Sequence, residues 1–67
     1  MMEMQSVNSS AISKVGYDES TQQMKIRFKQ GKVYDFCRVP KHIFQGLLAA
    51  SSKGTYYNNH IRDRYQC

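Results

Sequence analysis

The chain has 67 residues, of which 10 are lysine or arginine and 5 are aspartate or glutamate, so its formal net charge is +5. A chain of this length forms one small domain with a thin core, which excludes a second domain and a deep, enclosed substrate pocket. It has no run of about 18 apolar residues, which excludes a transmembrane helix, and its first residues do not resemble a secretory signal, so we expect a cytoplasmic protein with a basic surface.

The N-terminal part of the chain shows only weak alternation of apolar and polar residues. Residues 1–8 are polar apart from three methionines and a valine, and we expect them to be loosely ordered. Residues 9–17 alternate apolar and polar side chains imperfectly, which favours a strand. The turn-forming run Asp-Glu-Ser-Thr at 18–21 then separates this strand from the next.

The clearest strand covers residues 24–28, where the sequence Met-Lys-Ile-Arg-Phe alternates apolar and cationic side chains. A turn at Gln30-Gly31 follows, and residues 32–39 form the partner strand. These two strands are predicted to pair as a hairpin.

Two registers of this hairpin are open. A two-residue turn would place Asp35 among the apolar residues of the first strand, whereas a three-residue loop with a bulge and a left-handed Gly31 places Asp35 opposite Lys25 on the solvent side. Two-residue turns prefer Asn or Asp at the position that glutamine occupies here, and a buried, unpaired carboxylate is costly. We therefore favour the bulged register, which places Tyr34 and Phe36 in the core.

Helices are expected in the second half of the chain. Pro40 suits the first turn of a helix, and Gly54 suits a left-handed cap at its end. The apolar stripe of this helix consists of Ile43, Phe44, Leu47 and Leu48. Residues 55–65 predict a second short helix.

The predicted fold class is therefore α+β: a three-stranded antiparallel β-meander followed by two helices packed on one face, in the order β-β-β-α-α. The loosely ordered N-terminus is residues 1–8, and residues 9–67 form a single domain.

Motifs along nearly the whole chain occur in a recognisable order. They are Gly-Tyr-Asp at 16–18, Gly31-x-x-Tyr34-x-Phe36, Val39-Pro40, Tyr-Tyr-Asn at 56–58 and Ile-Arg at 61–62. Over residues 7–65 this order resembles the KTSC domain family. The resemblance implies a relative of an appendage found at the C-terminus of some lysyl-tRNA synthetases, and of small free-standing proteins in bacteria and their phages.

The function of that family is unassigned, and the synthetase context suggests RNA binding. The central Y-x-Y motif of the family appears here as Tyr34-Asp35-Phe36, so the second tyrosyl hydroxyl is absent. This departure argues against two phenols acting together. The family offers no catalytic residues to transfer.

Cationic side chains alternate along the clearest strand and continue beyond its turn. Such a stripe binds phosphates in nucleic-acid partners, but the same pattern also protects an exposed strand against aggregation. The candidates for phosphate contact are Lys25, Arg27, Lys29, Lys32, Arg38 and Lys41.

The segment 53–65 interleaves aromatic, amide and cationic side chains, as proteins that bind single strands require. Tyr57, Ile61 and Tyr65 have helical spacing and are predicted to lie in the core. The exposed candidates of this segment are Lys53, Tyr56, Asn59, His60, Arg62 and Arg64. The same residue types also anchor protein interfaces.

The cysteines and histidines carry no recognisable chemistry. We expect Cys37 and Cys67 to be free thiols in a reducing compartment, because a cysteine at the last position is poorly placed to brace a core. The spacing of Cys37, His42, His60 and Cys67 matches no common zinc site. No nucleophile, phosphate-loop or paired-carboxylate motif is present. We therefore expect no metal, no cofactor and no enzymatic activity.

The sequence thus predicts a small basic binding module for RNA or single-stranded nucleic acid. The alternative is a protein-interaction module with an acidic partner. No membrane partner is expected.

Overall fold

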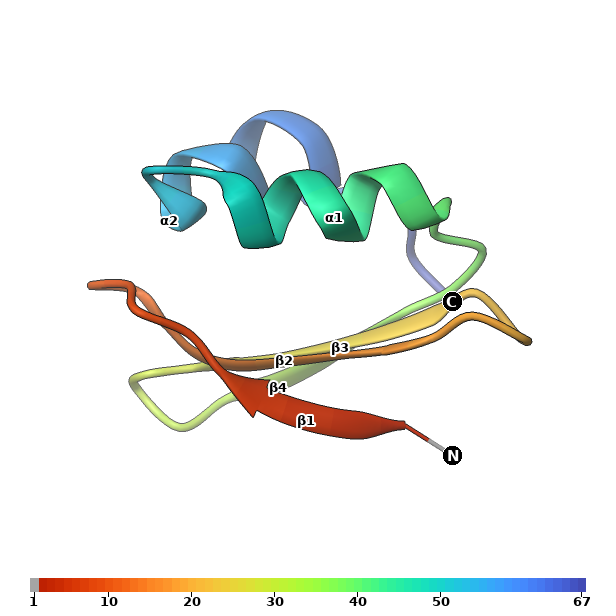
Figure 1. Cartoon of the computed structure of the whole chain (residues 1–67), viewed down its shortest axis with the longest axis horizontal. Coiled ribbons are helices and arrows are strands. Elements are labelled where there is room, and N and C mark those ends of the chain that lie inside the picture. The colour runs from red at the N-terminus through yellow and green to blue at the C-terminus, as the bar shows by residue number, and fades with distance from the viewer. Residues whose placement is uncertain (1) are drawn as a thin grey trace.

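In the computed structural model, which describes residues 2–67, four antiparallel strands form one sheet and helical segments cover one of its faces (Figure 1). The strands are β1 (Glu3–Ser6), β2 (Ile12–Asp18), β3 (Gln23–Phe28) and β4 (Val33–Phe36). The helical layer consists of α1 (Lys41–Ala49), α2 (Lys53–Tyr56) and the π-helical segment η1 (Tyr57–Ile61). The strands pair in sequence order, so the sheet is a meander.

The predicted α+β class, the antiparallel meander and the helices on one face are confirmed, but the sheet has four strands rather than three. The strands predicted over 9–17, 24–28 and 32–39 correspond to β2, β3 and β4. Within the part of the chain that the structure describes, no helix is long and apolar enough to cross a membrane.

The additional strand, β1, lies in the segment that we predicted to be loosely ordered. It pairs with β2 so that Met4 lies opposite Gly16. A side chain at position 16 would collide with β1, because a Cβ there would lie 2.6 Å from the Met4 sulfur. All four β1 residues are exposed, so backbone pairing rather than burial holds this strand, and its side chains show no alternation to detect.

The bulged register of the β3–β4 hairpin is confirmed. Lys25 lies opposite Asp35, and Ile26 lies opposite Tyr34. Gly31 has a φ of 104°, a conformation that other residues rarely adopt. The Lys25 ammonium lies 3.5 Å from a carboxylate oxygen of Asp35 on the side away from the helices.

The core prediction for this strand is half right. Phe36 is buried at 5% exposure, as expected, but Tyr34 is 43% exposed and is not a core residue. Tyr34 does point to the helical side, because its register partner Ile26 is fully buried. β4 is an edge strand, and the helical layer covers its C-terminal end at Phe36 but leaves Tyr34 partly exposed.

The helical layer differs from its prediction at Gly54. The first helix ends at Ala49, and Gly54 lies inside α2 instead of capping α1. The Ser52 hydroxyl accepts a hydrogen bond from the Thr55 amide and starts a new helix. A Cβ at position 54 would lie 3.4 Å from that of Ala11, so α2 lies next to the segment before β2.

The core lies between the sheet and the helical layer. It contains side chains from β2, β3 and β4, from the segment before α1, and from the helices. Its buried apolar side chains are Ile12, Val15, Met24, Ile26, Phe36, Val39, Leu47 and Ile61.

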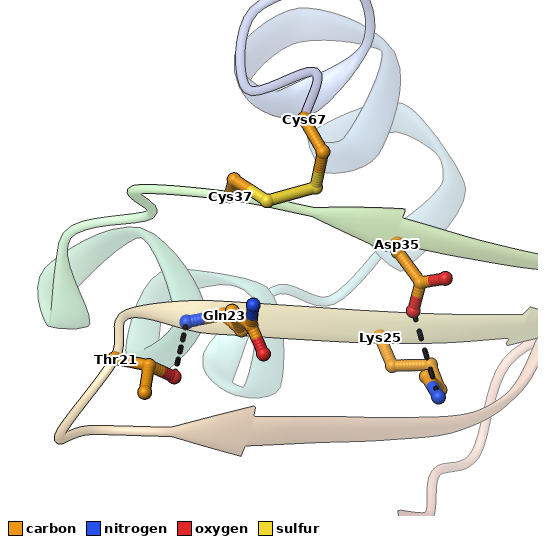
Figure 2. The surroundings of a disulfide bond; sticks show 6 residues. All are labelled: Thr21, Gln23, Lys25, Asp35, Cys37 and Cys67. Atoms are coloured by element: carbon orange, nitrogen blue, oxygen red, sulfur yellow. Dashed lines mark hydrogen bonds and ion pairs between the residues drawn. A yellow bond between two sulfur atoms is a disulfide. The ribbon is translucent and has the colours of Figure 1, made fainter.

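A disulfide joins Cys37 to Cys67 (Figure 2), so the prediction of free thiols was wrong. The C-terminal segment returns beside the end of β4, where the Cys37 amide donates a hydrogen bond to the Tyr65 carbonyl and Phe36 forms an isolated bridge with Gln66. These contacts bring the last residue of the chain next to a strand, which no local sequence pattern indicates.

Candidate functional site

Three cations gather on the face of the sheet that points away from the helices. Lys14 on β2 is the register partner of Arg27 on β3, and Lys25 lies two residues along β3 on the same face. The alternate residues of these strands, Val15 and Ile26, are fully buried on the helical side. Directly opposed residues on one face of a sheet lie about 5 Å apart, so Lys14, Lys25 and Arg27 form one continuous patch, the basic face.

Lys14 was missed in the sequence analysis. A β-bulge between Ile12 and Lys14 shifts the alternation of β2 by one residue, which made the pattern of this segment noisy. From Lys14 to Asp18 the strand is regular, so the alternation of side chains in this part predicts which face each residue occupies. Counting backwards from Tyr17 and Val15 places Lys14 on the open side.

The cations of the basic face differ in how well they are neutralised. Among residues 2–67 the ion pairs are Lys25–Asp35, Lys41–Glu19 and Arg62–Asp63. Lys14 and Arg27 therefore have no carboxylate partner there. Lys25 shares its charge with Asp35 in a pair that is itself exposed to solvent, and such a pair is weak and readily exchanged for another anion.

The charge on the open face is polarised along the strands. At the β2–β3 turn the Ser20 hydroxyl donates a 2.7 Å hydrogen bond to Asp18, and this bond lowers the pKa of the Asp18 carboxyl. At the opposite end of the sheet, the β3–β4 loop exposes Lys29 and Lys32. Figure 1 shows these two turns at opposite ends. An anion is therefore attracted toward the β3–β4 loop.

The other predicted phosphate contacts lie elsewhere. The Lys41 ammonium lies 2.9 Å from Glu19, near the acidic end of the sheet. Arg38 is exposed in the connection between β4 and α1, with a φ of 56°. Neither residue belongs to the basic face.

The candidates from the C-terminal segment lie in or after the helical layer. The Lys53 ammonium donates a hydrogen bond to the Ala50 carbonyl. The remaining exposed candidates are Asn59, His60, Arg62 and Arg64. The predicted set of binding residues is thus divided between two surfaces.

Tyr56 is not the exposed ring that we predicted. Its hydroxyl donates a 3.0 Å hydrogen bond to the Ile43 carbonyl, and its ring lies against α1 at Gly46, where a Cβ would collide with the phenol. The ring centroid of His60 lies 4.5 Å away. Helical spacing alone could not decide which of two consecutive tyrosines, Tyr56 or Tyr57, packs inward, and in fact both are partly buried.

A second group of aromatic side chains occupies the outer edge of the sheet. Phe28 makes edge-to-face contacts with Tyr34 and Tyr57, at centroid distances of 5.5 and 5.1 Å. Burial raises the pKa of the Tyr57 phenol, and the nearby charge of Arg62 opposes this effect. The phenol therefore stays protonated at neutral pH and can donate a hydrogen bond.

The sequence of the chain is similar to those of several known proteins. The profile of the KTSC domain matches residues 8–65. A protein from Tsukamurella paurometabola is 41% identical over 63 residues, which is 94% of each chain. A lysine–tRNA ligase from Nostoc punctiforme is 33% identical over 57 residues, which is 85% of this chain and 10% of the ligase.

The fold of the chain is also similar to that of a solved structure. The crystal structure of a KTSC domain protein from Yersinia pestis has a TM-score of 0.95 with this chain and 31% sequence identity, covering 100% of this chain and 94% of the other. The match therefore includes β1, which precedes the residues that the domain profile matches.

Proposed function

The chain belongs to the KTSC domain family, and we propose that it is a small binding module that holds RNA or another single-stranded nucleic acid on the basic face of its sheet. The observation that carries the proposal is the uncovered face itself, where Lys14 and Arg27 oppose each other without a carboxylate partner among residues 2–67. Phosphates are the usual ligands of such unpaired cations.

The relatives support an RNA ligand. Lysine–tRNA ligases, by their name, act on tRNA, and a segment similar to this chain makes up 10% of the one from Nostoc punctiforme. A small basic module within such an enzyme would add affinity for RNA if it contacted phosphates. This chain would make such contacts through its own basic face.

The test is a titration with tRNA, a single-stranded oligonucleotide and a duplex, by fluorescence anisotropy at low and moderate salt. Contacts with about four phosphates predict a log–log salt slope near −3 for a single strand. Replacing Lys14 and Arg27 by Gln together should weaken binding for every sequence and make the slope for a single strand shallower by about 1.4.

A matched control removes the same two charges elsewhere. The double variant Lys41→Gln with Lys53→Gln has the same net charge, but its substitutions lie off the basic face. We expect this control to bind almost as tightly as the unmodified protein. Equal losses in the two double variants, or no binding at low salt, would rule out the basic face as a specific site.

A protein-interaction role is the second candidate, and the outer edge of β4 favours it. Beyond the bridge at Phe36, no strand pairs with this edge among residues 2–67, and Val33 and Tyr34 expose 49% and 43% of their surface there. An acidic peptide in an extended conformation could add to such an edge. Binding of a peptide of this kind, with no response to any oligonucleotide, would establish this role instead.

A further inference from the structure

A surface cleft lies where the edge of the sheet meets the helical layer, next to the β3–β4 loop. It has a volume of about 230 Å³. The residues that line it are Phe28, Gln30, Tyr34, Tyr57, Asn58 and Arg62. We refer to this hollow as the aromatic cleft.

The three rings of the cleft are held in a fixed arrangement. Phe28 lies between Tyr34 and Tyr57, and both contacts are edge-to-face, with interplanar angles of 77° and 76°. Tyr34 keeps 43% of its surface exposed. A ring that is oriented by an edge-to-face contact and is partly exposed offers a surface on which another planar ring can stack.

The polar residues of the cleft are of the types that form hydrogen bonds with the edges of nucleobases. The side-chain amides of Gln30 and Asn58 make no hydrogen bond to other side chains or to the backbone among residues 2–67. Each amide can both donate to and accept from the edge of a base. The Nε atom of Arg62 lies 3.9 Å from Asp63, a long contact that leaves the outer guanidinium nitrogens available.

The charged residues around the cleft determine from which side an anionic chain can approach it. A neighbouring hollow of about 300 Å³ shares some of the lining but contains Asp35 and Asp63, which repel phosphates. No carboxylate lines the aromatic cleft itself. On its other side the cleft is bordered by the β3–β4 loop, where Lys29 and Lys32 are exposed on either side of Gln30.

We infer that the aromatic cleft holds one unpaired nucleobase, stacked on Tyr34, of a strand whose phosphates contact the loop lysines and continue to the basic face. This inference rests on the proposed function and names the part of the ligand that a second surface recognises. The positive loop on one side and the acidic hollow on the other favour a strand of nucleic acid over an apolar peptide.

The experiment compares a thymidine hexanucleotide with a hexamer of abasic nucleotides, which keeps the phosphates and lacks the bases. The unmodified protein should bind the thymidine strand about tenfold to a hundredfold more tightly, because stacking of a base on an aromatic ring contributes that much. The Tyr34→Ala variant should bind both strands with the affinity that the unmodified protein has for the abasic one.

Two further variants separate stacking from damage to the strand. Tyr34→Phe keeps a ring and should keep the preference for bases. Val33→Ala changes the neighbouring residue of β4, whose side chain lies on the opposite face next to Arg27, and should also keep the preference. Thermal unfolding of each variant, followed by circular dichroism, verifies that Tyr34→Ala is folded, as its exposed position implies.

The outcomes distinguish the two proposals. Equal binding of both hexamers by the unmodified protein overturns the base-binding cleft and leaves the phosphate contacts standing. No binding of either hexamer at low salt overturns both proposals. A preference that disappears in Val33→Ala as well as in Tyr34→Ala also overturns the cleft, because it shows that the edge strand and not the ring matters.

Discussion

The two faces of the sheet are made by the same strands and have opposite properties. On β3, Met24 and Ile26 are fully buried against the helices, while Lys25 and Arg27, which alternate with them, lie on the uncovered face. Burying an aliphatic side chain of this size contributes about 1.5–3 kcal/mol, whereas an exposed charge pair contributes about 0–1 kcal/mol.

Stability and charge are therefore divided between alternate residues of one strand. A substitution of a buried residue on the helical side should unfold the domain, and one of an exposed residue should change binding in a folded protein. The predictions below test stability and binding in this light, from the largest expected effect to the smallest.

Phe36→Ala should have the largest effect. Phe36 is buried at 5% exposure and contacts Tyr57 at a centroid distance of 6.0 Å. Removing its ring should lower the free energy of unfolding by about 3–5 kcal/mol, which is most of the stability of so small a domain. Tyr34→Ala on the same strand should lower the free energy of unfolding by much less, because Tyr34 is 43% exposed. Urea unfolding measures both, and equal losses would contradict the division.

Reduction of the Cys37–Cys67 disulfide should have the next largest effect. The bond joins residues that are 30 positions apart, and its loss should lower the free energy of unfolding by about 2–4 kcal/mol. The C-terminal segment that pairs with the end of β4 should become mobile first. Thermal unfolding with and without a reductant measures the loss, and the double variant Cys37→Ser with Cys67→Ser should not respond to the reductant.

Two glycines allow the helical layer and the open face to be compared directly. A Cβ at Gly46 would meet the ring of Tyr56, which is tied by its hydroxyl to Ile43, whereas one at Gly16 would meet the flexible end of Met4. Gly46→Ala should therefore lower the free energy of unfolding by about 1–3 kcal/mol, despite the gain in helix propensity.

Gly16→Ala should be milder, at about 1 kcal/mol or less, because a methionine side chain adapts to small changes of volume. The variant Tyr56→Phe provides the control for Gly46→Ala. Without the Tyr56 hydroxyl, part of the collision at position 46 is relieved, so Gly46→Ala should lower the free energy of unfolding by less in the Tyr56→Phe background. Unfolding in urea gives both differences. A larger loss for Gly16→Ala than for Gly46→Ala would show that β1 is more rigidly placed than its exposed side chains imply.

Local chemistry explains what could be predicted from the sequence. The alternation of residues 24–28, the glycine of the β3–β4 loop and the cost of burying Asp35 together determine the hairpin register, and the helical spacing after Pro40 determines α1. Each of these patterns depends on residues that are close together in the chain, so the structure it predicts can be inferred without knowing any tertiary contact.

The remaining features depend on contacts between distant segments. Cys67 meets Cys37 only because the chain returns along β4, and Tyr56 is covered only because α1 offers Gly46 beside it. The candidate site was partly predicted for the same reason: Arg27 follows from alternation, whereas its partner Lys14 is hidden by a bulge.

Asp35→Asn should have the smallest effect on stability and should sharpen the comparison between the two faces. The carboxylate is exposed and pairs with Lys25 at 3.5 Å (Figure 2), so its loss should change the free energy of unfolding by no more than about 0.5 kcal/mol. Binding of a single-stranded oligonucleotide should tighten, and the salt slope should steepen by about 0.7, because Lys25 becomes free to contact one more phosphate. Glu19→Gln removes the same charge next to Lys41, away from the basic face, and should leave the slope nearly unchanged. If both variants steepen the slope equally, net charge and not the position of Lys25 controls binding, and the open face then has no special role.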